Sequence, residues 1–382
     1  MTPSEQLVER ARELVPTLAE QAPATRSARR VSAESIERLH DAGFFKILQP
    51  ERWGGLELPP RVFFEVQAIL AEGCASTAWV FGVVAVHGWQ LALFDDQAQE
   101  DVWGEDPRAL ISSSYAPTGN AEPAEGGFRL SGRWSFSSGC DNCDWVFLGC
   151  FAPEMRTFLL PKADYRIEDN WNVVGLEGTG SKDIIVEDAF VPMHRTHLLL
   201  DGFKGSSPGN TVNTGPLYRI PFGQIFVRSV STTIVGVAQA ALDTFIRTAK
   251  ERIGASDSAR VALDPTARRV AAEATSIIDE TRLVLLRNVD ELWESAQRGE
   301  MLPIERRAQF RFESAKAVRK CSQAVEMLFG ASGGRAMFTD SPMQCLFQDA
   351  MAAALHFANK TDKPALNLGG VLLGGKTEDY FL

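Results

Sequence analysis

A stretch of strand-like sequence, residues 126–192, lies between two flanks whose patterns are helical. Within it Trp134 and Phe136 alternate with polar residues at a period of two, and residues 145–149 and 157–161 form short apolar runs. Such alternation, with turn residues between short apolar runs, predicts β-strands. We therefore expect an antiparallel β unit between two helical blocks, which makes the fold α+β.

The two flanks carry helix signals. Apolar residues recur at helical spacing over residues 4–22, and Ser32 and Gly43 have the residue types that start and stop a helix. After Pro192, four long segments have helical patterns and short connections, which indicates an antiparallel four-helix bundle. These segments are residues 226–252, 265–298, 303–329 and 342–356.

Three domains follow from this order. We expect an N-terminal α-helical domain over residues 1–115, a middle β domain over residues 116–200 and a C-terminal four-helix bundle domain over residues 201–382. Residues 201–222 are rich in Gly, Ser, Asn and Pro, and we expect them to form a linker or lid loop.

Composition excludes several function classes. The formal net charge of −10 argues against a nucleic-acid surface or an anionic membrane as a partner. We see no run of about 18 apolar residues and no signal-peptide pattern, so we expect no membrane span. The six cysteines lack the spacing of a disulfide framework, which indicates free thiols in a reducing, cytoplasmic compartment. Cys140 and Cys143 lack further ligands at suitable spacing, so we expect no metal site.

Three polar features of the sequence are candidates for chemistry. His87 lies in an apolar helical segment beside Gly88 and Trp89, where it is either a core residue or part of a pocket wall. Ser137-Ser138-Gly139 is either an ordinary strand exit or a ligand-binding edge. The serine run at residues 112–114 favours a polar connector. These alternatives stay open at the level of residue patterns.

Three motifs resemble the middle domain of the acyl-CoA dehydrogenase fold. They are Gly132–Gly139 (GRWSFSSG), Gly175–Ser181 (GLEGTGS) and Val186–Pro192 (VEDAFVP), in the order and spacing of that family. Dehydrogenase members of the family use a late glutamate as the base that removes the substrate α-proton. Residues 363–375 contain no such glutamate, which disfavours dehydrogenation.

Other segments are similar to the oxygenase components of two-component aromatic hydroxylases, among them hydroxyphenylacetate 3-hydroxylase and steroid-phenol hydroxylases. The similar segments are residues 73–80, 86–94, 111–117, 341–344 and 355–359. The resemblance implies a flavin-dependent monooxygenase that uses O2 and reduced FMN or FAD, supplied by a separate reductase. It implies a C4a-hydroperoxyflavin that hydroxylates a phenolic or related aromatic substrate, and a homotetramer assembled through the bundle.

The resemblance also implies roles for individual residues. The flavin ring would contact residues at the end of the 126–137 strand, and Ser138 would hydrogen-bond the flavin N5. Two polar side chains would hold the substrate phenol, and a late histidine would assist the oxygen reaction. The implied catalytic residues are His87, Ser138 and His356; the cofactor contacts are Phe136, Ser137, Ser138 and Arg228; and the substrate contacts are His87 and Ser113.

The sequence departs from the hydroxylase pattern at one segment. Cys345–Asp349 (CLFQD) stands where those hydroxylases carry Arg-Phe-Trp-Arg-Asp, so two arginines and a tryptophan are replaced. The chain also lacks the GxGxxG phosphate loop of a dinucleotide-binding fold, which favours a separate reductase. The alternatives are an acyl-CoA dehydrogenase-type flavoprotein and a non-catalytic scaffold of the same fold.

Overall fold

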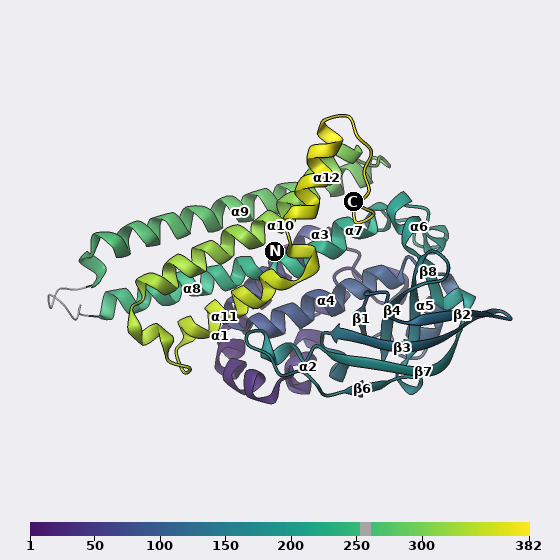
Figure 1. Ribbon diagram of the computed structural model, residues 1–382, viewed down its shortest axis with the longest axis horizontal. Coiled ribbons are helices and arrows are strands. Elements are labelled where there is room, and N and C mark those ends of the chain that lie inside the picture. Colours follow the sequence, from purple (N-terminus) through teal and green to yellow (C-terminus); the bar gives the residue numbers. More distant parts are fainter. Residues whose placement is uncertain (253–260) are drawn as a thin grey trace.

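A computed structural model describes residues 1–252 and 261–382. In Figure 1 the long bundle helices lie side by side at one end of the molecule, the strands lie at the other, and the helix labelled α4 runs between them. The N-terminal helices are α1 (Pro3–Ala28), α2 (Ala33–Asp41), α3 (Pro60–Gly73), α4 (Ala75–Leu91) and α5 (Asp96–Trp103).

Helix boundaries follow the capping residues of the sequence. The Ser32 hydroxyl accepts a hydrogen bond from the Ser35 backbone N–H at 3.1 Å, which starts α2. Gly43, just after α2, has a φ of 83°, a left-handed conformation that favours glycine. The helix predictions at both positions are confirmed.

In the described residues, eight strands form two four-stranded sheets. They are β1 (Ile111–Ser114), β2 (Asn120–Ala124), β3 (Gly127–Ser137), β4 (Trp145–Phe151), β5 (Met155–Pro161), β6 (Arg166–Glu168), β7 (Lys182–Pro192) and β8 (Thr196–Leu198). One sheet has the order β1-β4-β5-β8 and the other has the order β2-β3-β7-β6. Buried side chains of both sheets, such as Trp134, Phe158 and Ile184, form a core of their own.

The expectation of an antiparallel β unit over residues 126–192 is confirmed, and one parallel pair involves a strand before it. All strand pairs are antiparallel except β1 and β4, which pair in parallel, with Ser113 opposite Phe147. The reason is the chain path. Strands β2 and β3 belong to the other sheet, so the chain crosses over between β1 and β4, and a crossover permits parallel pairing.

The C-terminal half consists of helices. They are α6 (Leu199–Lys204), α7 (Phe222–Ser231), α8 (Thr233–Glu251), α9 (Pro265–Gln297), α10 (Ile304–Ala331), α11 (Pro342–Leu355) and α12 (Asp362–Leu372). Helices α8 to α11 form the predicted bundle (Figure 1). Helix α12 was not predicted, and its sequence PALNLGG carries two glycines and a proline that disfavour a helix.

The expectation of a linker or lid loop after the β domain is wrong. Residues 201–222 are not a free linker or lid, because Ser207, Asn213 and Leu217 are buried, and Asn213 donates a hydrogen bond to the Ala92 carbonyl at 2.8 Å.

Helices α7 and α8 together span Phe222–Glu251, which is long and apolar enough to cross a membrane by length and composition. However, 89% of its most apolar 18-residue stretch is buried inside the protein, as in the core helix of a globular fold.

Candidate active site

The end of strand β3 presents three of the predicted site residues. The register between β3 and β7 shifts between Trp134 and Ser137, and the residue in the shift, Phe136, has a φ of 69°. A positive φ at a bulky residue is uncommon and marks a conformation held by its surroundings. The shift leaves the Phe136 ring 71% exposed, edge-on to Trp171 at 6.1 Å, and turns Ser137 into the interior.

Ser138 belongs to a hydrogen-bonded group of buried hydroxyls. Its hydroxyl accepts a hydrogen bond from the Trp79 indole N–H at 3.2 Å and lies 2.7 Å from the Ser181 hydroxyl. The Ser181 hydroxyl in turn lies 2.7 Å from that of Thr179. The two sequence motifs on β3 and before β7 are therefore joined at Ser138. The Thr179 hydroxyl donates to the Leu176 carbonyl, so Ser181 donates to Thr179 and Ser138 donates to Ser181. Besides the bond from Trp79, the Ser138 oxygen therefore keeps one lone pair free as an acceptor.

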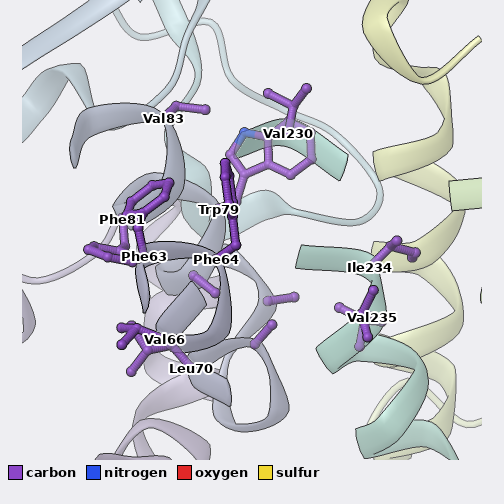
Figure 2. Close-up of a cluster of buried hydrophobic side chains, with 14 of the residues drawn as sticks. Phe63, Phe64, Val66, Leu70, Trp79, Phe81, Val83, Val230, Ile234 and Val235 are labelled. Carbon is purple, nitrogen blue, oxygen red and sulfur yellow. The ribbon is translucent and has the colours of Figure 1, made fainter. Parts of the chain in front are cut away.

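Trp79 connects Ser138 with His356. In Figure 2 the indole ring points away from Phe63 and Phe81 and toward Val230 of α7. The ring meets the imidazole of His356 edge-on, with centroids 5.7 Å apart. The structure thus brings together residues from β3, α4 and the end of α11.

His356 has a defined tautomer. Its Nδ1 accepts a hydrogen bond from the Ala358 backbone N–H at 3.3 Å, so in the neutral ring the proton lies on Nε2. Burial, and then the nearby Arg311 guanidinium, lower the pKa of His356 to about 4. A neutral imidazole with Nε2–H is a hydrogen-bond donor, and it can stabilise negative charge on an atom beside Trp79.

His87 has the opposite tautomer. It is fully buried in α4, and its Nδ1 lies 2.6 Å from the Ile111 carbonyl, so Nδ1 carries the proton. Its Nε2 is buried and has no hydrogen-bond partner among the described residues. Burial lowers the pKa of His87 to about 4, and the hydrogen bond to the Ile111 carbonyl offsets only part of that decrease. At neutral pH, Nε2 therefore holds a free lone pair, the form of a general base.

Aromatic rings run from one histidine to the other. His87 lies 6.2 Å from Tyr115 between ring centroids, and Tyr115 lies 4.9 Å from Phe226. Phe381 then contacts Phe226 at 6.2 Å and Phe357 at 5.9 Å, and Phe357 lies 4.8 Å from His356. This set of four rings between the two histidines, Tyr115, Phe226, Phe381 and Phe357, is called the aromatic wall below.

The residues predicted to bind the substrate lie at the His87 end of the aromatic wall. Ser113 is half-buried on β1, next to the strand residues that contact His87. The Tyr115 phenol donates a hydrogen bond to Gln90. Burial raises the pKa of Tyr115, and Ser113 and Gln90 oppose that rise in part. His87 and Trp79 are eight residues apart on α4, which is about 12 Å along the helix axis. The two ends of the site therefore lie on one rigid element.

Arg228 is not brought together with these residues. It is buried on α7, where its guanidinium bonds to Gln224 and lies 5.7 Å from the Phe310 ring centroid. Its role toward the cofactor stays a prediction.

Several residues of the site were missed at the level of sequence. Trp79, Tyr115 and Phe381 gave no local pattern that separates them from core aromatics. Asp349 was quoted only within the departure from the hydroxylase pattern. It is buried, accepts a hydrogen bond from the Leu176 N–H at 2.7 Å, and raises the pKa of Arg26.

The cysteines take no part in this site. Cys140 and Cys143 are buried free thiols, and burial raises the pKa of both. In the described residues no group of three or more His, Cys, Asp or Glu side chains has the geometry of a metal site.

Comparison with known proteins identifies the family. Residues 3–106 match the acyl-CoA dehydrogenase N-terminal domain, and residues 229–361 match the acyl-CoA dehydrogenase C-terminal domain. The chain is 40% identical over 365 residues, 93% of this chain and 95% of the relative, to "Flavin-dependent monooxygenase, oxygenase subunit HsaA" of Rhodococcus jostii (strain RHA1). The chain belongs to the acyl-CoA dehydrogenase family, in its branch of flavin-dependent monooxygenases.

Two further relatives agree with this placement. The chain is 34% identical to "FADH(2)-dependent resorcinol hydroxylase, oxygenase component" of Rhizobium sp. (strain MTP-10005), over 92% of this chain and 90% of the relative. The crystal structure of "3-HSA hydroxylase" from Rhodococcus sp. RHA1 superposes with a TM-score of 0.95 at 38% identity and covers 99% of both chains. The prediction of an aromatic hydroxylase of the two-component class is confirmed, and with it a reduced flavin cofactor from a separate reductase.

The site residues fit a reduced flavin. The Ser137 hydroxyl is buried and has no partner among the described residues, and the Ser138 oxygen beside it keeps one lone pair free. The exposed ring of Phe136 offers an apolar face next to these two hydroxyls. A planar ring with polar edges matches such a surface, because the hydroxyls can bind its edge while Phe136 covers apolar area.

Proposed function

We propose that the enzyme hydroxylates a phenolic substrate held along the aromatic wall, between His87 and His356. The observation that carries this proposal is the pair of opposite tautomers. His87 offers a lone pair at Nε2, and His356 offers a proton at Nε2. A phenol can give its proton to the His87 Nε2, and its flat ring can pack against the aromatic wall.

His87 acts on the substrate in this proposal. Its Nε2 accepts the proton of the phenol, and the ring carbons of a phenolate are better nucleophiles than those of the phenol. Ser113 accepts or donates a hydrogen bond at the same oxygen and fixes the ring orientation. A pKa of about 4 makes His87 a weak base, so it shifts the proton only as the transition state develops, when the phenol becomes more acidic.

His356, Ser138 and Trp79 serve the other end of the site. When bound, reduced flavin supplies the electrons that activate O2. Ser138 would accept a hydrogen bond from an N–H at the edge of the reduced flavin, and the bonds to Trp79 and Ser181 hold its hydroxyl in place. His356 donates a hydrogen bond from Nε2–H to the reacting oxygen and so stabilises the negative charge that develops there, and the Trp79 ring fixes the imidazole plane. The aromatic wall excludes water, which keeps the oxygen from being lost as hydrogen peroxide.

Other properties carried from the resemblance belong to the same proposal. We propose a homotetramer assembled through the bundle, a cytoplasmic location and exchange of reduced FMN or FAD with the reductase. A dehydrogenase activity is disfavoured because residues 363–375 contain no glutamate that could act as the base. A scaffold without turnover would need neither the free Nε2 of His87 nor the oriented His356.

Two variants test the roles of the histidines. His87→Asn should keep the oxygen reaction but release hydrogen peroxide in place of product. His356→Ala should slow the oxygen reaction itself, with or without substrate. Loss of one acid–base group lowers a rate about 10²–10⁴-fold. The assay is rapid mixing of each variant with reduced flavin and oxygen, followed by quantification of product and peroxide.

His197→Asn is the matched control. His197 is also buried with its pKa lowered to about 4, but it stacks on Phe94 and bonds to Ser207, outside the aromatic wall. Its loss should leave the ratio of product to peroxide unchanged. If His87→Asn and His356→Ala both couple oxygen fully to product at the rate of the unchanged enzyme, the proposal is wrong.

A further inference from the structure

A cavity of about 330 Å³ lies between α1, α3, α8 and α9. None of its lining residues belongs to the aromatic wall or to the Ser138 group. Most of the lining is apolar, and it includes Phe64, Ile69, Val235, Leu285 and Val289. Cavities of this size with mostly apolar walls and a few polar groups are typical of small-molecule sites.

The buried charged residue of the cavity lining is Arg228. Its side chain is fully buried, and its Nη1 donates to the Gln224 backbone and, at 3.2 Å, to the Gln224 side chain. Its Nε and Nη2 have no hydrogen-bond partner among the described residues. These two N–H groups share one edge of the planar guanidinium, the edge that binds a carboxylate with two parallel hydrogen bonds.

Other charges on the cavity wall have partners of their own. Glu65 pairs with Arg61 at 3.0 Å, and Glu72 lies 3.8 Å from Arg282. Neither glutamate forms an ion pair with Arg228 in the described residues. Burial lowers the pKa of Arg228 to about 9, and the carboxylate of Glu313, which forms no ion pair with it among the described residues, opposes this only in part. A buried cation without a paired anion is unfavourable, and an anion that enters the cavity reduces that penalty.

We propose that this cavity is a second ligand site, which binds a small organic carboxylate with an apolar body. The carboxylate pairs with Nε and Nη2 of Arg228, and the apolar body lies against Phe64, Ile69 and Leu285. The site is separate from the catalytic one, so the ligand need not be the substrate. A flavin phosphate is the other anion that the arginine could meet, and the experiment distinguishes the two.

Calorimetric titration of the flavin-free enzyme with sodium benzoate tests the proposal. We expect one binding event per chain. Benzamide has the same shape without the charge, and it should bind at least tenfold more weakly. Arg228→Met keeps most of the side-chain volume and removes the guanidinium, and it should weaken benzoate binding at least tenfold as well.

A second variant tests the cavity without changing the arginine. Ala68 lines the cavity, and Ala68→Leu fills part of it, so benzoate binding should be lost while turnover is kept. His87→Asn should bind benzoate as the unchanged enzyme does, and so should the enzyme saturated with reduced FMN under anaerobic conditions.

Four results would overturn the proposal. They are no binding by the unchanged enzyme, equal binding by Arg228→Met, loss of binding in His87→Asn, and loss of binding when reduced FMN is present. The third would place benzoate at the aromatic wall, and the fourth would assign Arg228 to the cofactor.

Discussion

Acid should destabilise the folded enzyme through His87, and the size of the effect follows from its burial. The folded-state pKa is about 4, whereas an unfolded chain has a histidine pKa of about 6.5. The pKa is lowered in the folded state, so above pH 6.5 both states hold a neutral ring and stability is full. As the pH falls from 6.5 toward 4, the unfolded chain gains a proton that the folded protein does not, and stability is lost.

The magnitude can be worked out from these two values. Each pKa unit corresponds to about 1.4 kcal/mol, so the full contribution of His87 below pH 4 is about 3 kcal/mol. Between pH 7.5 and pH 5 the free energy of unfolding should fall by about 2 kcal/mol from this residue alone. That is a large share of the stability of an ordinary domain.

His87→Asn removes the titrating group while it keeps a polar side chain. Urea unfolding, followed by tryptophan fluorescence at one fixed protein concentration, gives the stability of both proteins at pH 7.5 and pH 5. The unchanged enzyme should lose about 2 kcal/mol more than His87→Asn between the two pH values. His197→Asn, with the same pKa shift, should show a similar difference. Equal pH dependence in the unchanged enzyme and His87→Asn would show that His87 takes up a proton in the folded state, and would refute the reasoning.

Two further predictions concern how the site is closed and positioned. A methyl group at Gly223 would overlap the Phe381 backbone, so Gly223→Ala should displace Phe381. This variant should release several-fold more hydrogen peroxide while its flavin affinity stays unchanged. The control is Gly334→Ala, whose methyl group meets no atom within 4 Å and should change neither the peroxide release nor the flavin affinity. Asp349→Ala leaves the Leu176 N–H without its acceptor and Arg26 without one carboxylate, so it should lower the free energy of unfolding by about 1–3 kcal/mol in urea titrations and weaken reduced-flavin binding. Unchanged flavin affinity in Asp349→Ala would mean that the loop before β7 keeps its place without Asp349.

The sequence predicts the parts of this fold that depend on local signals. Ser32 caps α2, and Asp264 caps α9 by accepting a hydrogen bond from the Ala267 N–H at 2.9 Å. Both caps follow from residue types within one helical turn. The strand end at Ser137 and Ser138 and the histidine in α4 were also found, since motifs of a known family cover them.

Long-range packing could not be predicted in the same way. Residues 201–222 have the composition of a free loop, but Asn213 bonds to the Ala92 carbonyl and to Gln99, more than a hundred residues away. Phe381 meets Phe226 through contacts that no sequence spacing encodes. Local composition describes the chain's own conformational preferences, whereas these contacts depend on which distant surface covers the segment.

The segment that departs from the hydroxylase pattern shows what such a contact does. Asp349 is the one residue of Cys345–Asp349 that agrees with the family motif, and it holds the Leu176 N–H. Leu176 in turn accepts a hydrogen bond from Thr179, whose hydroxyl meets Ser181, the partner of Ser138. The four changed positions lie outside this chain of hydrogen bonds. The aspartate therefore suffices to connect α11 with the hydroxyl group proposed to bind the flavin, and the replaced arginines and tryptophan are not needed for that connection.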